Sequence, residues 1–326
     1  HYLEVLNRAL LSIEEPDRIS HVEEILTQYR QALRQHLRSA FQQHRRHRLS
    51  LAERAPMPLT TALMDGGVAR GRDFHVAMEY NLPGLYERGL ANAANALASL
   101  QHVVFEERWL RLDEVLAAMR ADFPDETLRR RLSNAPRWGN DDDRADRWAL
   151  RLQEIREEVK REVEAELGEP YHLSCHVVRS LHHVDGRRIG ASPDGRRAGK
   201  PVSDSIGACP GTPKAGPTAL LNSVRKLQPA RYWAGGTNLN LNLPPMAVQS
   251  YDQLRSVVAM VDAFFADGGQ ELQLACLDGA ALRRAQRHPE EFPDLVVRVA
   301  GFNARFVSLS PAQQEEVIAR AEAAQA

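Results

Sequence analysis

The 326-residue chain is poor in cysteine and in net charge, and it has no long apolar run. Its three cysteines, Cys175, Cys209 and Cys276, are too few and too scattered for a disulfide framework, so a reducing cytoplasm is the expected location. A net charge of −1 argues against nucleic acid or an anionic membrane as the main partner. No run approaches the roughly 18 apolar residues of a membrane span.

Nucleotide-binding signatures are also missing. The glycine-rich stretch Ser192–Gly199 lacks the Lys-Ser/Thr ending of a P-loop, and Gly235-Gly236 lacks the Rossmann spacing. Asp194 and Arg196 within the stretch are expected to shape a turn. Neither pattern supports a nucleotide site.

Two histidine groups are candidates for a metal or catalytic site. His172 and His176 flank Cys175, but no second ligand pair at zinc-site spacing follows, so a structural role is favoured. The pair His182-His183 stands directly before a turn-like Asp-Gly, and it is interpreted as the approach to a hairpin. The sequence therefore predicts no metal site.

Hydrophobic residues make up 43% of the chain and charged residues 26%, which is enough apolar material for a sizeable core. Helical periodicity predicts helices over 21–41, over 91–105 and in the long stretch after the loop 134–143. The basic run 44–48 is interpreted as a solvated helix end, because cations suit a helix C-terminus.

Beyond Pro170 the pattern changes to short apolar runs alternating with loops, and one helix is expected at 251–265. Strands are predicted at 175–181, 237–243, 271–277 and 295–299. Strands separated by helical stretches indicate an α/β fold with crossover connections. Ser310 is expected to cap a last helix, with Gln313 completing a capping box.

One glycine stands inside a long pattern near the C-terminus. Gly301 lies in Arg298-Val-Ala-Gly-Phe302, and Gln314 and Arg320 follow at fixed spacing. A radical on a backbone Cα is delocalised only if the centre flattens, and glycine alone has no Cβ to crowd that arrangement. A simple turn glycine is the alternative reading.

The pattern resembles the signature of the glycyl radical enzymes, the relatives of pyruvate formate-lyase and glycerol dehydratase. Further segments resemble the same family in the same order along the chain. They are Arg70–Asp73, Asn134–Asp143, Ala191–Pro201, Gly216–Ala219, Asn222–Leu227, Gly268–Gln273 and Ala285–Glu290. Phe302 departs from the family, which usually has tyrosine after the glycine.

The resemblance implies the second half of a ten-stranded α/β barrel with a C-terminal glycine-radical loop and helix. Residues 1–175 would form a pyruvate formate-lyase-like helical and half-barrel portion, and 176–326 the glycine radical domain. The family's thiyl cysteine lies upstream of the matching segments, and none of the three cysteines here has its context. The chain is therefore expected to be the C-terminal part of a longer enzyme and to be inactive alone.

The implied activity is anaerobic elimination, decarboxylation or C–C cleavage of a small polar substrate, with the radical stored on Gly301. Arg298, Phe302, Gln314 and Arg320 would support the radical loop or meet a substrate anion; for the two arginines, salt bridges that brace the loop are an equal alternative. No cofactor or metal would be bound. A separate activating enzyme with S-adenosylmethionine and an iron–sulfur cluster would make the radical, and the protein would be a cytoplasmic homodimer.

Three alternatives stay open: formate acetyltransferase activity, a spare-part protein that supplies a fresh glycine loop, and a structural subunit without its own active-site cysteine. The segment Gly216–Ala219 and the residue Ala300 favour the dehydratase branch over pyruvate formate-lyase. Elimination needs an acid and a base near the leaving group, whereas acyl transfer needs a second thiol to hold the acyl group.

Overall fold

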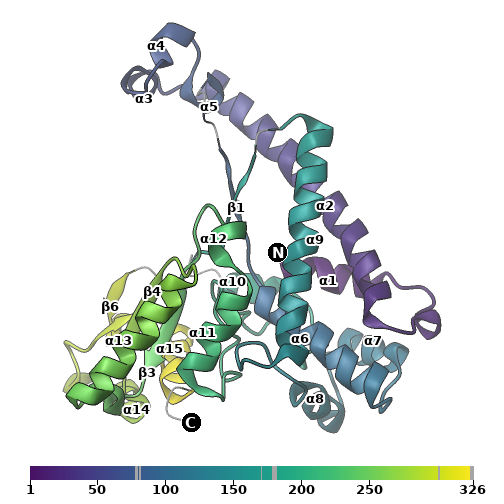
Figure 1. The fold of residues 1–326 in the computed structure, drawn as a ribbon, viewed down its shortest axis with the longest axis vertical. Helices are drawn as coiled ribbons and strands as arrows, with labels where there is room; N and C mark the ends of the chain where they lie inside the picture. Colours follow the sequence, from purple (N-terminus) through teal and green to yellow (C-terminus); the bar gives the residue numbers. More distant parts are fainter. Residues whose placement is uncertain (78–79, 81, 170, 178–181, 300–301, 324–326) are drawn as a thin grey trace.

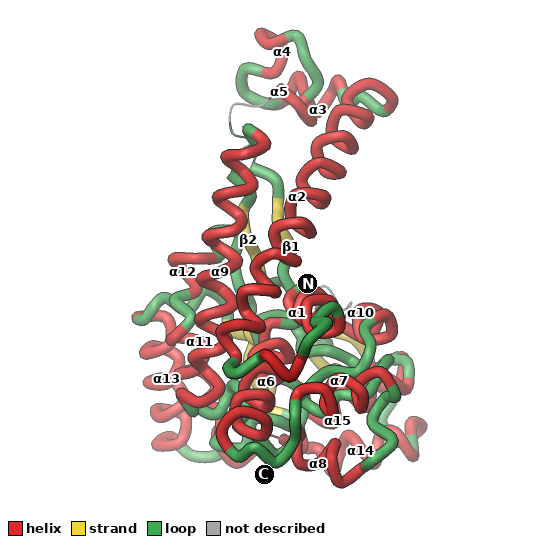
Figure 2. The backbone as a smooth tube through the Cα atoms, turned by 90° about the vertical axis from the view of Figure 1, so that its right-hand side faces the viewer, coloured by secondary structure: helices red, strands yellow, loops and turns green. Residues whose placement is uncertain are grey.

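The computed structural model describes residues 1–77, 80, 82–169, 171–177, 182–299 and 302–323. Two long helices, α2 (Val22–Arg54) and α9 (Asp143–Leu167), run side by side out of a broad body, and three short helices lie at the far end of this arm (Figures 1 and 2). The short helices are α3 (Pro58–Leu63), α4 (Gly67–Arg70) and α5 (Phe74–Ala77). No helix in the described part is both long and apolar enough to cross a membrane.

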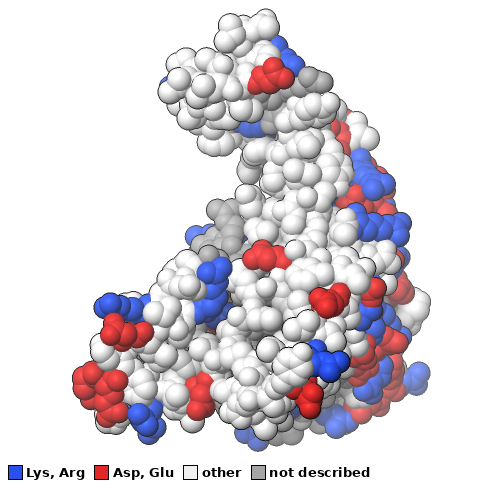
Figure 3. Space-filling view, turned by 60° about the vertical axis from the view of Figure 1, so that its left-hand side comes forward, with Lys and Arg blue, Asp and Glu red and all other residues white. Residues whose placement is uncertain are grey.

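Helix α2 confirms the periodicity prediction but ends later than expected. Its apolar stripe, from Val22 to Phe41, is buried, and the helix continues through the basic run to Arg54. The predicted end at 44–48 is therefore wrong. Arg48 lies inside the helix and donates to Glu169 just after α9, at 3.1 Å. Arg30 and Arg34, earlier in α2, form ion pairs with Glu158 and Glu166 of α9 and so join the two long helices, and Figure 3 shows charges of both signs interspersed along one edge.

Helix α6 (Leu90–Ser99) is the centre of the body. Every one of its residues is buried, because its small side chains allow close packing on α1 (Tyr2–Leu11) and α9. A π-helical segment, Leu100–Glu106, continues it, so the predicted helix over 91–105 is confirmed with a widened last turn. Helices α7 (Leu112–Arg120) and α8 (Glu126–Ser133) follow on the outside.

The first four strands form two short parallel pairs with helical crossovers, as the α/β prediction requires. Strand β1 (Gly84–Tyr86) pairs with β2 (Leu173–Cys175), and β3 (Leu239–Leu243) pairs with β4 (Leu272–Cys276). A single parallel bridge between His176 and Thr237 links the two pairs. Helices α6 to α9 connect β1 to β2, and α13 (Tyr251–Ala266) connects β3 to β4. Residues 178–181 of the predicted strand 175–181 lie outside the described residues.

The C-terminal part adds an antiparallel pair, β5 (Val296–Arg298) with β6 (Asn303–Arg305), and the last helix α15 (Pro311–Ala323). The predicted cap is confirmed: the amide of Gln313 donates to the Ser310 hydroxyl (3.4 Å) and the Gln313 side chain accepts from the Ser310 amide (3.2 Å).

The remaining helices and the 3₁₀ turns complete the fold. They are α10 (His182–Arg188), α11 (Gly216–Lys226), α12 (Pro229–Tyr232), α14 (Gly279–Arg287), and the 3₁₀ turns Pro16–Arg18, Pro245–Val248, Pro289–Glu291 and Phe306–Ser308. Helix α10 corrects one prediction: His182 and His183 open a helix and do not lead into a hairpin. The apolar side chains of β5, α14 and α15 form a small core of their own, separate from the main one.

A buried charge pair joins the helical and strand layers. The Glu87 carboxylate, just after β1, lies 3.2 Å from the Arg156 guanidinium of α9, and it also accepts from the Tyr2 hydroxyl (2.7 Å) and the Trp233 indole (2.9 Å). Burial raises the pKa of Glu87, but Arg156 and the other donors bring it below its ordinary value. The carboxylate is therefore held ionised inside the core.

Replacing Arg156 with methionine is expected to lower the free energy of unfolding by about 3–5 kcal/mol, because Glu87 is then a buried charge without its cation. The double variant Glu87→Gln/Arg156→Met should recover a large part of the loss. Urea unfolding measures both. Arg161→Met is the matched control and should matter little, because the Arg161 side chain is 71% exposed and its partner Glu157 keeps Arg156 and Lys160 as cations. Equal losses in the single and double variants would contradict the charge argument.

Candidate functional site

The residues on either side of Gly301 belong to the β5–β6 pair. Arg298 is aligned with Asn303 across the pair, and the amide of Val299 donates to the carbonyl of Phe302 at 3.1 Å. Gly301 and Ala300 lie outside the described residues. Val299 and Phe302 are the described residues nearest to Gly301 in the sequence.

The four residues predicted to support the loop make different contacts. Arg320 of α15 donates to the carbonyls of Arg298 (3.2 Å) and Val299 (3.1 Å), the last described residues before Gly301. Arg298 donates to the side chains of Gln273 (3.1 Å) and Asn303 (3.2 Å). Among the described residues, the hydrogen bonds of both arginines thus go to neutral oxygens.

The other two predicted residues lie further from that corner. Gln314 donates to the Phe306 carbonyl at 3.0 Å and so ties the start of α15 to the 3₁₀ turn that follows β6. Phe302 is 50% exposed. Their roles in catalysis stay predictions.

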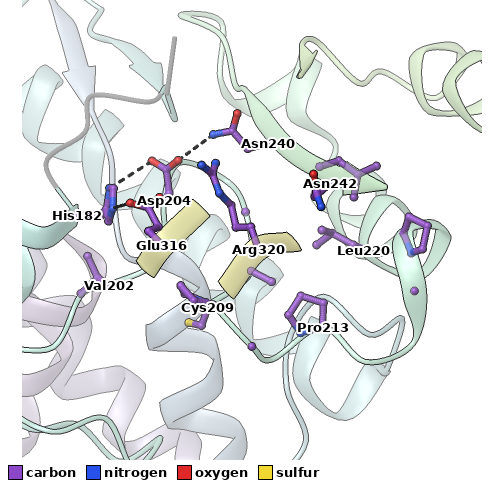
Figure 4. Close-up of a pocket in the computed structure, with 17 residues that line it drawn as sticks. His182, Val202, Asp204, Cys209, Pro213, Leu220, Asn240, Asn242, Glu316 and Arg320 are labelled. Atoms are coloured by element: carbon purple, nitrogen blue, oxygen red, sulfur yellow. Dashed lines mark hydrogen bonds and ion pairs between the residues drawn. The ribbon is translucent and has the colours of Figure 1, made fainter. Parts of the chain in front are cut away.

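A cavity of about 100 Å³ lies beside the Arg320 side chain (Figure 4). Asp204, Asn240 and Arg320 supply polar groups to its wall, and Asn240 donates to the Asp204 carboxylate at 2.9 Å. Apolar lining comes from Leu220 and Val202. The cavity therefore combines a carboxyl group, whose pKa burial raises, with an amide and a guanidinium, groups that can bind the hydroxyl and carboxylate groups of a small molecule.

Strand β3 explains part of this wall. Leu239, Leu241 and Leu243 are buried, while Asn240 and Asn242 are half-buried between them and line the cavity. This alternation is visible in the sequence, and it could have predicted that the two asparagines share the face opposite the buried leucines. No sequence pattern around Asp204 predicts that it lines the cavity. Its loop lies next to β3 only because tertiary packing brings the two together.

Two histidines and a glutamate meet next to the cavity. Glu316 of α15 lies 2.6 Å from the His182 ring and 2.9 Å from the His183 ring. Burial lowers the pKa of His182, but Glu316 and then Asp204 raise it, so that the net pKa lies above its ordinary value. Burial raises the pKa of Glu316, and its bonds to the two histidines bring it down to about 2. These contacts connect the start of α10 with the last helix.

The three cysteines occupy three different surroundings. Cys175 is buried and Cys276 is exposed. Cys209 lines the cavity, and its sulfur accepts from the Asn95 amide at 3.4 Å. Burial, followed by the nearby Asp194 carboxylate, raises the pKa of the Cys209 thiol to about 12, so this thiol stays protonated.

The predicted structural roles of His172, His176, Asp194 and Arg196 agree with the contacts. His172 stacks on Phe41, with ring centroids 3.8 Å apart, and His176 stacks on Tyr2. The Asp194 carboxylate accepts from the Ser192 hydroxyl within its own turn. Arg196 donates to the carbonyls of Gly190 and Lys200, each at 2.6 Å, and so closes the turn around Gly195.

Replacing Arg320 with methionine is expected to destabilise the β5–β6 corner by about 1–3 kcal/mol, because two carbonyls before Gly301 lose their donor. Urea unfolding and faster hydrogen exchange at the amides of β5 and β6 measure the loss. Arg283→Met is the control: Arg283 also pairs with α15, through exposed Glu315 and Glu322, and should change little. The same exchange pattern in both variants would contradict a specific role of Arg320.

Comparison with known proteins identifies the family. A family model described as pyruvate formate lyase-like matches residues 6–182, and one described as glycine radical matches residues 202–307. The chain belongs to the pyruvate formate-lyase-like family and so to the glycyl radical enzyme superfamily. The boundary predicted between residues 175 and 176 stays a prediction.

The similar curated proteins are dehydratases and lyases. Trans-4-hydroxy-L-proline dehydratase of Clostridioides difficile is 32% identical over 277 residues, which are 83% of this chain and 34% of that protein. Isethionate sulfite-lyase of Oleidesulfovibrio alaskensis is 30% identical over 321 residues, 96% of this chain and 38% of that protein. The chain therefore spans little more than a third of the length of these relatives.

Two similar solved structures are also dehydratases. The glycerol-bound B12-independent glycerol dehydratase from Clostridium butyricum has a TM-score of 0.88 at 26% identity, over 98% of this chain and 42% of that one. The hydroxyproline dehydratase from Clostridioides difficile with its substrate bound has a TM-score of 0.87 at 26% identity, with the same coverage. The predicted fold, part of an α/β barrel of the glycyl radical enzyme type, is confirmed.

Proposed function

We propose that the protein containing this chain stores a radical on Gly301 and uses it, through a cysteine thiyl radical, for elimination on a small polar substrate. The observation that carries this proposal is the position of Arg320. The same side chain binds the two carbonyls before the glycine loop and lines the polar cavity. It therefore connects the radical loop to the place where a substrate can lie.

In the proposed mechanism, the radical on Gly301 takes the hydrogen atom of a cysteine thiol, and the thiyl radical takes one from the substrate. A neighbouring group then leaves, and the hydrogen atom returns. The protein orients these partners and excludes water and oxygen. Arg320, Asn240 and Asp204 supply the charge and hydrogen bonds that hold the substrate's polar groups.

The radical requires a partner. A separate activating enzyme that uses S-adenosylmethionine and an iron–sulfur cluster removes the hydrogen atom from Gly301, so this chain needs no bound cofactor of its own for storage. Decarboxylation and C–C cleavage use the same radical relay. Elimination is favoured because the similar proteins include a hydroxyproline dehydratase, an isethionate sulfite-lyase and a (2S)-3-sulfopropanediol dehydratase.

The test compares two reaction classes in the activated, full-length protein under anaerobic conditions. Glycerol, 1,2-propanediol, trans-4-hydroxy-L-proline and isethionate probe elimination, and pyruvate with coenzyme A probes acyl transfer. We expect loss of water or sulfite from a member of the first set and no acetyl-coenzyme A from the second. Formation of formate and acetyl-coenzyme A would overturn the proposal. The Gly301→Ala variant serves as the blank for background reaction.

A further inference from the structure

Three side chains with metal-ligating atoms converge from two helices. His182 and His183 open α10, and Glu316 lies on α15, more than 130 residues later in the chain. The Nε2 atoms of both histidines face the same carboxylate oxygen of Glu316, at 2.6 and 2.9 Å. The three potential ligand atoms lie within 4.8 Å of one another. Such convergence on one point is what a metal ion requires of its ligands.

The surroundings orient His182 for this role. His182 is 5% exposed, and its Nδ1 atom has no hydrogen-bond partner among the described residues, although it lies 3.8 Å from the Asp204 carboxylate. Asn240 fixes that carboxylate from the other side. A histidine that binds a metal through Nε2 carries its proton on Nδ1, and metal sites commonly place a carboxylate there. The Asp204 carboxylate lies on that side of the ring, at 3.8 Å.

We propose that His182, His183 and Glu316 bind a divalent transition-metal ion, with zinc as the best match. Two imidazole nitrogens and one carboxylate oxygen form a donor set that suits zinc, and water completes the coordination. The carboxylates of Glu316 and Asp204 offset the charge of the ion, while the Arg320 guanidinium faces the same cavity. The two carboxylates thus balance a divalent cation, and the Arg320 guanidinium remains as one further positive charge in the cavity.

The ion has a route to the site. His183 and Glu316 line a wide hollow of about 520 Å³, whereas His182 and Glu316 line the smaller cavity beside Arg320. The ligands therefore stand between the two spaces, and His183 is within reach of solvent. A bound ion connects α10 to α15, whose apolar side chains pack in the separate C-terminal core. The expected consequence is a firmer attachment of the last helix to the body.

Zinc binding to metal-stripped protein tests this directly, and it needs no radical activation, so its failure is distinct from a failure of the proposed function. We expect one zinc ion per chain by competition with a chromophoric chelator. Zinc should also slow hydrogen exchange in α15. His183→Ala and Glu316→Gln should each abolish both effects, and Asp204→Asn should weaken zinc binding by about 10–100-fold. Circular dichroism checks that each variant is folded.

A matched control separates this site from adventitious binding. His288, Glu290 and Glu291 form another group with ligand atoms close together, but all three are exposed. His288→Ala should leave zinc binding and the protection of α15 unchanged. Loss of zinc in His288→Ala, undiminished binding in folded His183→Ala, or no stoichiometric zinc in the unmodified protein would each overturn the proposal. The last result would mean that the histidines only donate hydrogen bonds to Glu316.

Discussion

Replacing Gly301 with alanine is expected to abolish the organic radical of the activated protein. An alanine Cβ crowds the planar arrangement that delocalises a Cα radical over the adjoining amide and carbonyl, whereas glycine leaves that space free. The full-length protein, incubated anaerobically with its activating enzyme and S-adenosylmethionine, should show a doublet in electron paramagnetic resonance, because one α-hydrogen remains on the radical carbon. The variant should show none.

Gly190→Ala provides the matched control for this substitution. A Cβ built on Gly190 meets nothing within 4 Å, and this glycine is not among those with positive φ, so the change tests only whether any glycine-to-alanine substitution disturbs activation. The doublet should persist in Gly190→Ala. A doublet that survives in Gly301→Ala would show that the radical resides elsewhere. Loss of the signal in both variants would point to a folding defect.

Much of the fold could be predicted because burial follows from the spacing of apolar side chains. The stripe from Val22 to Phe41 repeats at helical spacing and is buried as expected. The run Leu239–Leu243 alternates with period two and forms a strand with its leucines in the core. In both cases the apolar face of the element is buried away from water. The period of the apolar residues indicates whether that element is a helix or a strand.

The errors have a common physical cause, which is contact between residues distant in sequence. The basic run after Phe41 was expected to end its helix, yet Arg48 reaches Glu169, 121 residues away. For His182 and His183 the sequence predicts the approach to a hairpin, because their neighbours Asp185 and Gly186 favour turns. Their partner Glu316 lies on the last helix, and no sequence pattern near the two histidines predicts this contact.

The sequence predicts the chemistry of the candidate site, but it does not predict the contacts that hold the glycine loop and the cavity wall in place. The pattern around Gly301 predicts a radical position through its resemblance to the family signature, and the chemistry explains why that residue is glycine. The partners of Arg320 are backbone carbonyls, which every residue has, so no sequence pattern distinguishes them from a carboxylate or a substrate. The wall of the cavity combines a loop, a strand and the last helix, and only the folded chain brings them together.

Exposure of the activated protein to air is expected to cut the chain at Gly301. Oxygen adds to the carbon-centred radical and gives a peroxyl group on the backbone, which then breaks at that residue. Mass spectrometry should show a shortened protein that has lost the chain from Gly301 onward, and the electron paramagnetic resonance doublet should disappear on the same timescale. Both changes should be complete for the fraction of chains that carried the radical.

The position of the break is the decisive readout, because ordinary proteolysis of an exposed loop can also remove a C-terminal segment. Cleavage should require both prior activation and oxygen, and it should be absent from protein kept anaerobic and from Gly301→Ala treated in the same way. Proteolysis would instead cut all of these samples alike. A break at another residue, or an intact chain after the radical has been quenched by oxygen, would count against Gly301 as the radical position even if the doublet itself had been observed.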